Sequence, residues 1–172
     1  MNGDQQNTPG DAGEGFWRFS LAFYARPGVA AALLALQDSA GCNVNLILFA
    51  LWLGAVRGEP LDAAGLAAAK AVIGPLDARV IAPLRRLRRR LKGSADGDVE
   101  SVRRRIAALE IGAERQAQYR LAGCRAATVD AAPAGDRLAA AMANLASCLG
   151  DADRSAEADL LRRTLAAMMR RG

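Results

Sequence analysis

The sequence predicts an all-α protein, a compact bundle of six to eight helices around a buried central helix near residues 44–56. Apolar residues make up 52% of the 172 residues and are mostly Ala and Leu, and Ala, Leu and Arg are among the strongest helix formers. Apolar positions recur every three or four residues along most of the chain. No segment shows the period of two that a half-buried strand requires.

The chain length predicts one main domain with an appended helical hairpin. Residues 1–13 are polar and rich in Gly, so we expect a disordered N-terminal tail there. Residues 14–127 form the predicted main helical domain. Residues 128–172 are predicted to form a linker and a C-terminal hairpin, with helices at about 136–149 and 155–171.

An aromatic-rich segment predicts the first helix. Five of the eight aromatic residues lie within nine positions, at spacings that turn most of them toward a core. These five are Phe16, Trp17, Phe19, Phe23 and Tyr24. Pro27 suits the first turn of the next helix, and Gly41 suits the position after its end.

The central helix follows a junction that contains two asparagines. Asn43 is a natural N-cap, because its side-chain oxygen can accept a hydrogen bond from a backbone N–H of the first turn. The run from Val44 to Val56 is apolar nearly all round, which predicts burial. Asn45 is then a polar side chain in the core that needs a partner, and we expect Gln37, Asp38 or the end of the preceding helix to supply it.

Three further helices are predicted between residues 62 and 126. The first is rich in Ala, is capped by Asp62 and is expected to end at Gly74-Pro75. A basic helix at 75–92 follows, with a kink or a break at Pro83, and a long helix capped by Asp98 follows that. The apolar faces expected for these last two helices are Val80, Leu84, Leu87 and Leu91, and Val102, Ile106, Leu109 and Ala113.

The positive charge of the protein is concentrated in its second part. Residues 1–74 carry a net charge of −2 and residues 75–172 a net charge of +7, within a total of +5. Six cations cluster on the basic helix: Arg85, Arg86, Arg88, Arg89, Arg90 and Lys92. A cationic face of this kind binds anionic partners when it is not simply solvated, and Arg103, Arg104 and Arg105 extend the patch if the two helices form an antiparallel hairpin.

Several classes of chemistry are excluded by residue content. The chain has no histidine, which removes Ser-His-Asp and Cys-His nucleophiles and His-containing zinc and di-iron sites. Three widely spaced cysteines cannot form a four-thiolate zinc site, and there is no phosphate-binding glycine loop. We predict no catalytic residue, metal or cofactor. The sequence favours a protein that is not an enzyme, although an enzyme based on carboxylates or Arg stays compatible with it.

Two carboxylates, Glu110 and Glu114, lie one helical turn apart. They could act in acid/base or metal chemistry. We interpret them instead as members of ion pairs between helices, with Arg103, Arg115 and Arg120 as the nearby cations. The cysteines are interpreted as small core residues, and Cys42 alone lies near a helix N-terminus, where a thiol pKa can fall.

The leading functional hypothesis is a non-enzymatic binding or regulatory protein whose basic helix contacts an acidic protein. Nucleic acid is a weaker alternative, because no helix-turn-helix stands out and the aromatics lie elsewhere. An anionic membrane surface is also weaker, because the apolar face of the basic helix lacks Trp and Phe. The second hypothesis is a small-molecule-binding protein or enzyme with a pocket formed by Trp17, Tyr24, Gln37, Asn43 and Asn45.

The N-terminal residues do not resemble a signal peptide, because no apolar stretch follows a basic one. The longest apolar run, from Val44 to Val56, is shorter than the roughly 20 residues that a membrane-spanning helix needs. The odd number of cysteines fits a reducing compartment. We therefore expect a cytoplasmic protein with no transmembrane segment.

Several short motifs resemble an uncharacterised proteobacterial protein family. They are Trp17-Arg18-Phe19-Ser20, Tyr24-Ala25-Arg26-Pro27-Gly28-Val29, Leu36-Gln37-Asp38 and Asn43-Val44-Asn45-Leu46-Ile47-Leu48-Phe49, with Pro83-Leu84-Arg85 and the segment around Glu110, Glu114 and Gln116 further on. The resemblance covers about residues 16–120. It implies a bacterial, cytoplasmic domain of unknown function and carries over no functional residue.

Overall fold

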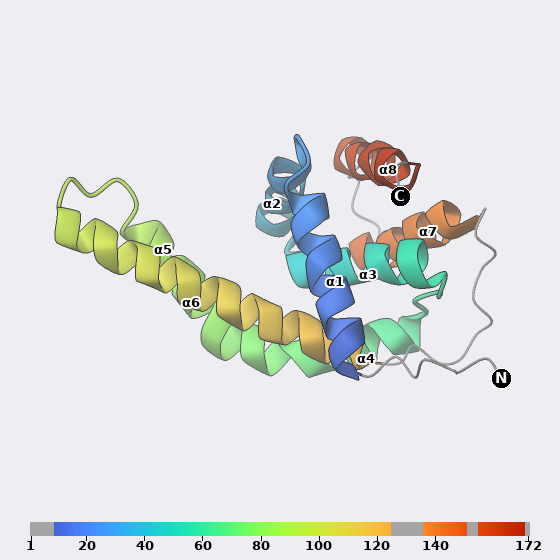
Figure 1. Cartoon of the computed structure of the whole chain (residues 1–172), viewed down its shortest axis with the longest axis horizontal. Helices are drawn as coiled ribbons and strands as arrows, with labels where there is room; N and C mark the ends of the chain where they lie inside the picture. Colours follow the sequence, from blue (N-terminus) through green and yellow to red (C-terminus); the bar gives the residue numbers. More distant parts are fainter. Residues whose placement is uncertain (1–8, 125–135, 151–154, 171–172) are drawn as a thin grey trace.

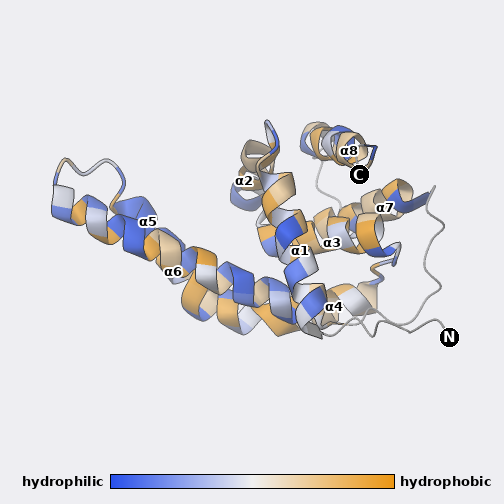
Figure 2. Cartoon of the chain, in the orientation of Figure 1, coloured by the Kyte–Doolittle hydropathy of each residue, from blue (hydrophilic) through white to orange (hydrophobic). Residues whose placement is uncertain are grey.

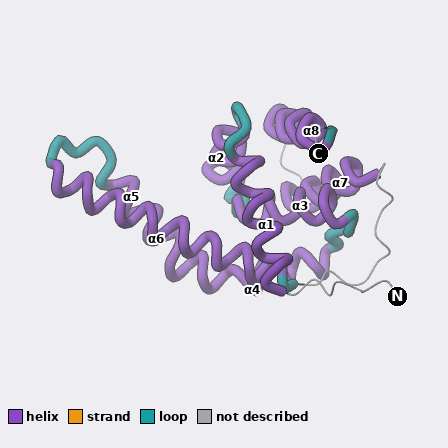
Figure 3. Tube along the Cα trace, viewed as in Figure 1, coloured by secondary structure: helices purple, strands orange, loops and turns teal. Residues whose placement is uncertain are grey.

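A computed structural model describes residues 9–124, 136–150 and 155–170. Within these ranges the chain is helical and has no strand, as the sequence predicts (Figure 3). The helices are α1 (Pro9–Tyr24), α2 (Val29–Ala40), α3 (Val44–Trp52), α4 (Ala63–Leu76), α5 (Ala82–Arg90), α6 (Gly97–Ala122), α7 (Arg137–Leu149) and α8 (Ser155–Met169). Two π-helical turns, η1 (Leu53–Arg57) and η2 (Asp77–Ile81), continue α3 and join α4 to α5.

Helix α3 forms the centre of the body, which confirms the predicted central helix (Figure 1). Every residue from Asn45 to Trp52 is buried, and α1, α2, α6 and α7 all pack against it. Figure 2 shows that α3 is hydrophobic along its length, in contrast to α5. A helix that is apolar on all sides has no face to present to water and therefore occupies the core.

Helix α1 directs its aromatic face onto α3. The ring centroids of Phe16 and Trp52 are 5.1 Å apart, and Phe16 also contacts Phe49 at 5.8 Å. Phe16 and Phe23 are fully buried, as the spacing predicts. The helix begins at Pro9, so residues 9–13, which we expected in a disordered tail, are helical; residues 1–8 lie outside the described residues.

The junction before α3 has the predicted geometry. Asn43 Oδ1 accepts hydrogen bonds from the backbone N–H groups of Asn45, at 2.9 Å, and Leu46, at 3.3 Å. The predicted partner of Asn45 is wrong, because its Oδ1 accepts a 3.0 Å hydrogen bond from Gln118 Nε2 of α6. Gln118 is itself buried, so this bond joins two buried amides across the core, while Gln118 Oε1 has no hydrogen-bond partner among the described residues.

Replacing Asn43 with Ala should lower the free energy of unfolding by about 1 kcal/mol, because two backbone donors of α3 lose their acceptor. For a chain of this size this corresponds to a melting temperature lower by about 2–4 °C, measured by circular dichroism. Asn43→Asp keeps the acceptor and should melt within about 1 °C of the wild type. An unchanged melting temperature for Asn43→Ala would show that the cap contributes nothing.

The segment from Ala63 to Arg90 differs from the prediction. Pro75 does not end α4, which continues through it into η2. Pro83 lies in the first turn of α5, where its missing N–H does no harm, and the π-helical turn directly before it adjusts the backbone. Helix α6 is capped by Asp96 rather than by Asp98, through 2.8 Å and 3.4 Å bonds to the N–H groups of Asp98 and Val99.

The two C-terminal helices pack against the body. Helix α7 lies on α3 and η1, and α8 lies on α2. Asn144 of α7 accepts a hydrogen bond from the Leu61 N–H at 2.7 Å and donates to the carbonyls of Ala50 and Glu59 at 3.2 and 2.9 Å. Leu145 and Leu165 belong to the common core. The linker predicted before α7, residues 128–135, lies outside the described residues.

No single helix among the described residues is long and apolar enough to cross a membrane. Helices α1 and α2 reach the required length and composition only as a pair, and the two are bent by 101° at their junction.

Candidate functional site

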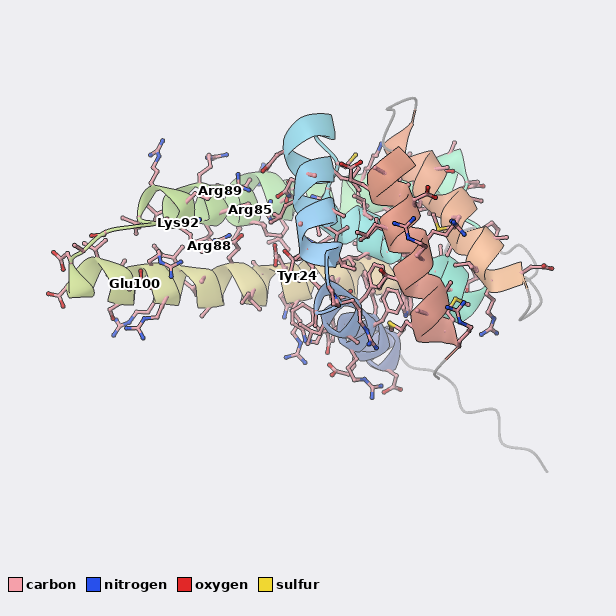
Figure 4. The ribbon with its side chains drawn as sticks, turned by 90° about the horizontal axis from the view of Figure 1, so that it is seen from above. Tyr24, Arg85, Arg88, Arg89, Lys92 and Glu100 are labelled. Atoms are coloured by element: carbon pink, nitrogen blue, oxygen red, sulfur yellow. The ribbon has the colours of Figure 1, made fainter. Side chains whose placement is uncertain are left out.

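Helices α5 and α6 form an antiparallel hairpin that projects from the body (Figures 1 and 4). We call α5, the first half of α6 and the loop that joins them the arm, residues 82–109. The second half of α6 packs in the body against α1, where Tyr119 donates a 2.6 Å hydrogen bond to Glu14 and Arg115 pairs with the same carboxylate at 2.9 Å. Helix α6 therefore anchors the arm to the core.

The base of the arm is held by a cluster of four charges. Arg85 binds Glu110 at 3.0 Å and Glu114 at 2.8 Å, and Arg88 binds both oxygens of Glu110. The Glu110 side chain is only 6% exposed. Two carboxylates and two guanidinium groups balance one another, and the bidentate geometry fixes the register of α5 on α6. The predicted interhelical pairing of Glu110 and Glu114 is correct in kind, but the partners are Arg85 and Arg88 rather than Arg103, Arg115 and Arg120.

The two carboxyl groups of this cluster differ in pKa. Burial alone raises the pKa of Glu110, but the hydrogen bonds and charges of Arg88 and Arg85 outweigh burial and hold it below its ordinary value. Burial raises the pKa of Glu114, and the single guanidinium of Arg85 does not reverse that effect. Glu110 is therefore the carboxylate on which the cluster depends at neutral pH.

The other predicted partner-binding residues lie outside this cluster. Arg89 forms a 3.3 Å ion pair with Asp38 of α2, and both side chains are exposed. Arg86, Arg90 and Lys92 are exposed and form no ion pair within the described part of the chain. The same holds for Arg104 and Arg105 on α6, whereas Arg103 pairs with Glu100 at 2.6 Å. The structure thus separates cations with an internal role from cations that face solvent.

Two adjacent cavities lie at the junction of α2 and α3, where they face α4, η2 and α5. Their volumes are about 360 and 250 Å³, and both are lined by Gly41, Cys42, Asn43 and Asp77. Lys70 lines the larger cavity, and Arg86 and Arg89 line the smaller one. We call this pair of cavities the junction groove. It can hold a small polar ligand against cationic side chains.

The five residues of the predicted pocket do not gather at one place. Asn43 lines both parts of the junction groove, and Gln37 lines the smaller part. Asn45 is buried against Gln118, and the Trp17 ring lies under the Arg115 guanidinium at 5.9 Å. Tyr24 lies near the base of the arm, where burial and then the charge of Glu114 raise its pKa.

The remaining chemistry of the described residues is limited. Burial raises the pKa of the Cys148 thiol to about 11, so this group is protonated at neutral pH and a poor nucleophile. No group of three or more Cys, Asp and Glu side chains in the described ranges could hold a metal ion. Sequence reasoning missed Gln118 and Asn144, which carry the buried polar contacts, because nothing in their local pattern marks them.

A family model described as a protein of unknown function, DUF2390, matches residues 15–121. The chain belongs to the DUF2390 family. The match includes α3, both helices of the arm and the cluster at its base, and it agrees in extent with the resemblance noted above. No curated protein and no solved structure matches the chain. Family membership assigns no activity, so any function for this DUF2390 protein has to be argued from its own residues.

Proposed function

We propose that this DUF2390 protein is a non-enzymatic cytoplasmic binding protein whose arm contacts an acidic protein. The observation that carries the proposal is the placement of charge on a projecting element. The arm, residues 82–109, contains nine Lys or Arg and three Asp or Glu, a net charge of +6 against +5 for the whole chain. The remainder of the protein is therefore slightly acidic, and the positive potential belongs to the arm.

The internal ion pairs refine the set of partner-binding residues. Arg85 and Arg88 are neutralised by Glu110 and Glu114, so they hold the arm in shape rather than contact a partner. Arg86, Arg90 and Lys92 remain for the partner, with Arg104 and Arg105 beside them on α6. Exposed guanidinium groups without internal partners bind carboxylates in bidentate geometry at little desolvation cost.

A charge-reversal experiment tests this function. Arg90→Glu/Lys92→Glu/Arg105→Glu should weaken binding of labelled poly-L-glutamate to the full chain by at least about tenfold at low salt, because the three reversals remove the net positive charge of the arm. Arg18→Glu/Arg120→Glu/Arg163→Glu changes the net charge equally at exposed positions outside the arm and should weaken it far less. Equal losses in the two triple variants would contradict the proposal, because net charge rather than the arm would then determine binding.

A second candidate function is binding of a small anionic ligand in the junction groove. The observation that favours it is the placement of Lys70, Arg86 and Arg89 around adjacent cavities. A thermal-shift series with small phosphates and carboxylates tests this candidate. A ligand that stabilises the wild type but not Lys70→Ala would support it, and no stabilisation by any of them would remove it.

A further inference from the structure

One face of the arm and of the turn before it is apolar and open to solvent. Four large apolar side chains on it are exposed: Val80 by 37%, Leu87 by 44%, Val102 by 49% and Leu109 by 63%. All four lie on the apolar faces predicted for the basic helix and the long helix, and the placement of Val102 and Leu109 in a core stripe is wrong. We call these four residues the apolar face. Val102 and Leu109 are seven residues apart within α6, which keeps them on one line; Leu87 lies on α5, and Val80 lies in η2 directly before it.

The two lines lie on the same side of the hairpin. Arg88 of α5 and Glu110 of α6 face each other across it. Leu87 directly precedes Arg88, and Leu109 directly precedes Glu110. In two antiparallel right-handed helices, the residues that directly precede a facing pair lie on the same side of the hairpin. The residues that directly follow the pair lie on the opposite side of the hairpin. Arg89 is one of them, and it forms an ion pair with Asp38 of α2. Leu87 and Leu109 therefore share the side of the hairpin that is turned away from the contact with α2, and Val102 lies on the same side of α6.

The charges around this face indicate what covers it. Arg90 and Arg105 flank it, and neither forms an ion pair within the described ranges. A second copy of the chain would set its own arm, with a net charge of +6, against an arm of equal charge, which opposes self-association. An amphipathic helix with acidic flanks complements both properties, because its apolar side chains would cover the face and its carboxylates would meet the arginines.

We propose that the acidic partner presents an amphipathic α-helix, which docks along Val80, Leu87, Val102 and Leu109 with its carboxylates on Arg90 and Arg105. This inference rests on the proposed function and specifies the form of the partner. The apolar residues of α5 and α6 and the apolar side of the docked helix would form a three-helix contact. Leu87 and Leu109 would become buried in it. The apolar contact then contributes binding free energy that salt does not screen, in addition to the electrostatic attraction.

The probe is a blocked, fluorescein-labelled 21-residue peptide with Leu at heptad positions a and d and Glu and Ala elsewhere. Its comparison peptide has the same composition in an order that puts the Leu residues on different faces. Fluorescence anisotropy with the full chain should give a Kd at least about tenfold lower for the amphipathic peptide, because only it can bury its leucines together. Leu87→Gln/Leu109→Gln should remove most of this difference.

Leu21→Gln/Leu34→Gln is the matched control, because these leucines are exposed by 51% and 39% and belong to α1 and α2 rather than to the apolar face. It should keep the preference for the amphipathic peptide. Circular dichroism of both double variants should show wild-type helix content, since all four leucines are exposed in the chain alone.

Four results would overturn the inference. Equal affinity for the two peptides, unaffected by Leu87→Gln/Leu109→Gln, would show that the arm binds by charge alone and would leave the proposed function standing. Failure of both peptides and of poly-L-glutamate to bind would remove the proposed function as well. A dimer in sedimentation velocity that Leu87→Gln/Leu109→Gln converts to a monomer would assign the face to a second copy. Tighter binding of a 20-base-pair duplex than of the amphipathic peptide would assign the arm to nucleic acid.

Discussion

Replacing Gly54 with Ala is expected to lower the free energy of unfolding by about 3 kcal/mol or more. A Cβ at this position of η1 would lie 2.3 Å from both the N and the Cα of Ala141 in α7. Backbone atoms cannot turn away as a flexible side chain can, so α7 would have to move off α3 and η1. That movement would also stretch the three hydrogen bonds of Asn144.

The expected decrease in melting temperature is about 6–12 °C in differential scanning calorimetry. Gly112→Ala provides the control, because a Cβ there meets nothing within 4 Å and Gly112 lies within α6. This change should be neutral or stabilising by up to about 1 kcal/mol, since Ala favours a helix over Gly. If Gly54→Ala were as stable as Gly112→Ala, α7 would not pack on η1 as described.

Replacing Glu110 with Gln is expected to cost about 2–4 kcal/mol at neutral pH, the second large effect. The change leaves the partly buried guanidinium groups of Arg85 and Arg88 without the carboxylate that balances them. Glu114→Gln is the matched comparison one turn away. Its cost should stay within about 1 kcal/mol, because Glu114 is 28% exposed and burial already raises its pKa.

The pH dependence of this effect has a defined sign. The pKa of Glu110 is lower in the folded protein than the ordinary value of 4.5, so its contribution to stability is present above pH 4.5 and is lost as the pH falls through the folded-state pKa. The stability difference between wild type and Glu110→Gln should therefore shrink in urea titrations below pH 4.5. The raised pKa of Glu114 acts in the opposite direction, because its contribution is lost as the pH rises. A difference independent of pH would contradict the assignment of Glu110 as the charged partner.

Local signals predicted the parts of the fold that depend on neighbours in sequence. The cap at Asn43 and the turn at Gly41, with its φ of +64°, depend only on residues within a few positions, and both are as predicted. The burial of residues 45–52 follows from their uninterrupted apolar character. The contacts that position α7 and the arm join residues far apart, such as Asn144 with Leu61 and Arg88 with Glu110. No periodicity of one segment encodes such a pairing.

The apolar faces of α5 and α6 show a different limit. The heptad-like spacing of Leu87 and of Val102 and Leu109 correctly showed that each helix has an apolar line. It did not show what covers that line, and we assigned the lines to the core. In the structure, Ile106 of the predicted stripe is buried, and Arg85, Arg88 and Glu110 make polar contacts between the two helices. Each line is therefore divided, with Ile106 buried and Leu87, Val102 and Leu109 exposed to solvent.

The central claim is that the arm, rather than the junction groove, is the binding surface of this DUF2390 protein. An amide chemical-shift titration of the full chain with the acidic amphipathic peptide tests it most directly. The account predicts that the perturbed amides cluster in residues 80–92 and 98–109, with little change around Gly41–Asn43 and Lys70. Perturbations centred on Gly41, Cys42, Asn43 and Lys70, with the arm unchanged, would contradict the claim and place the binding site in the junction groove.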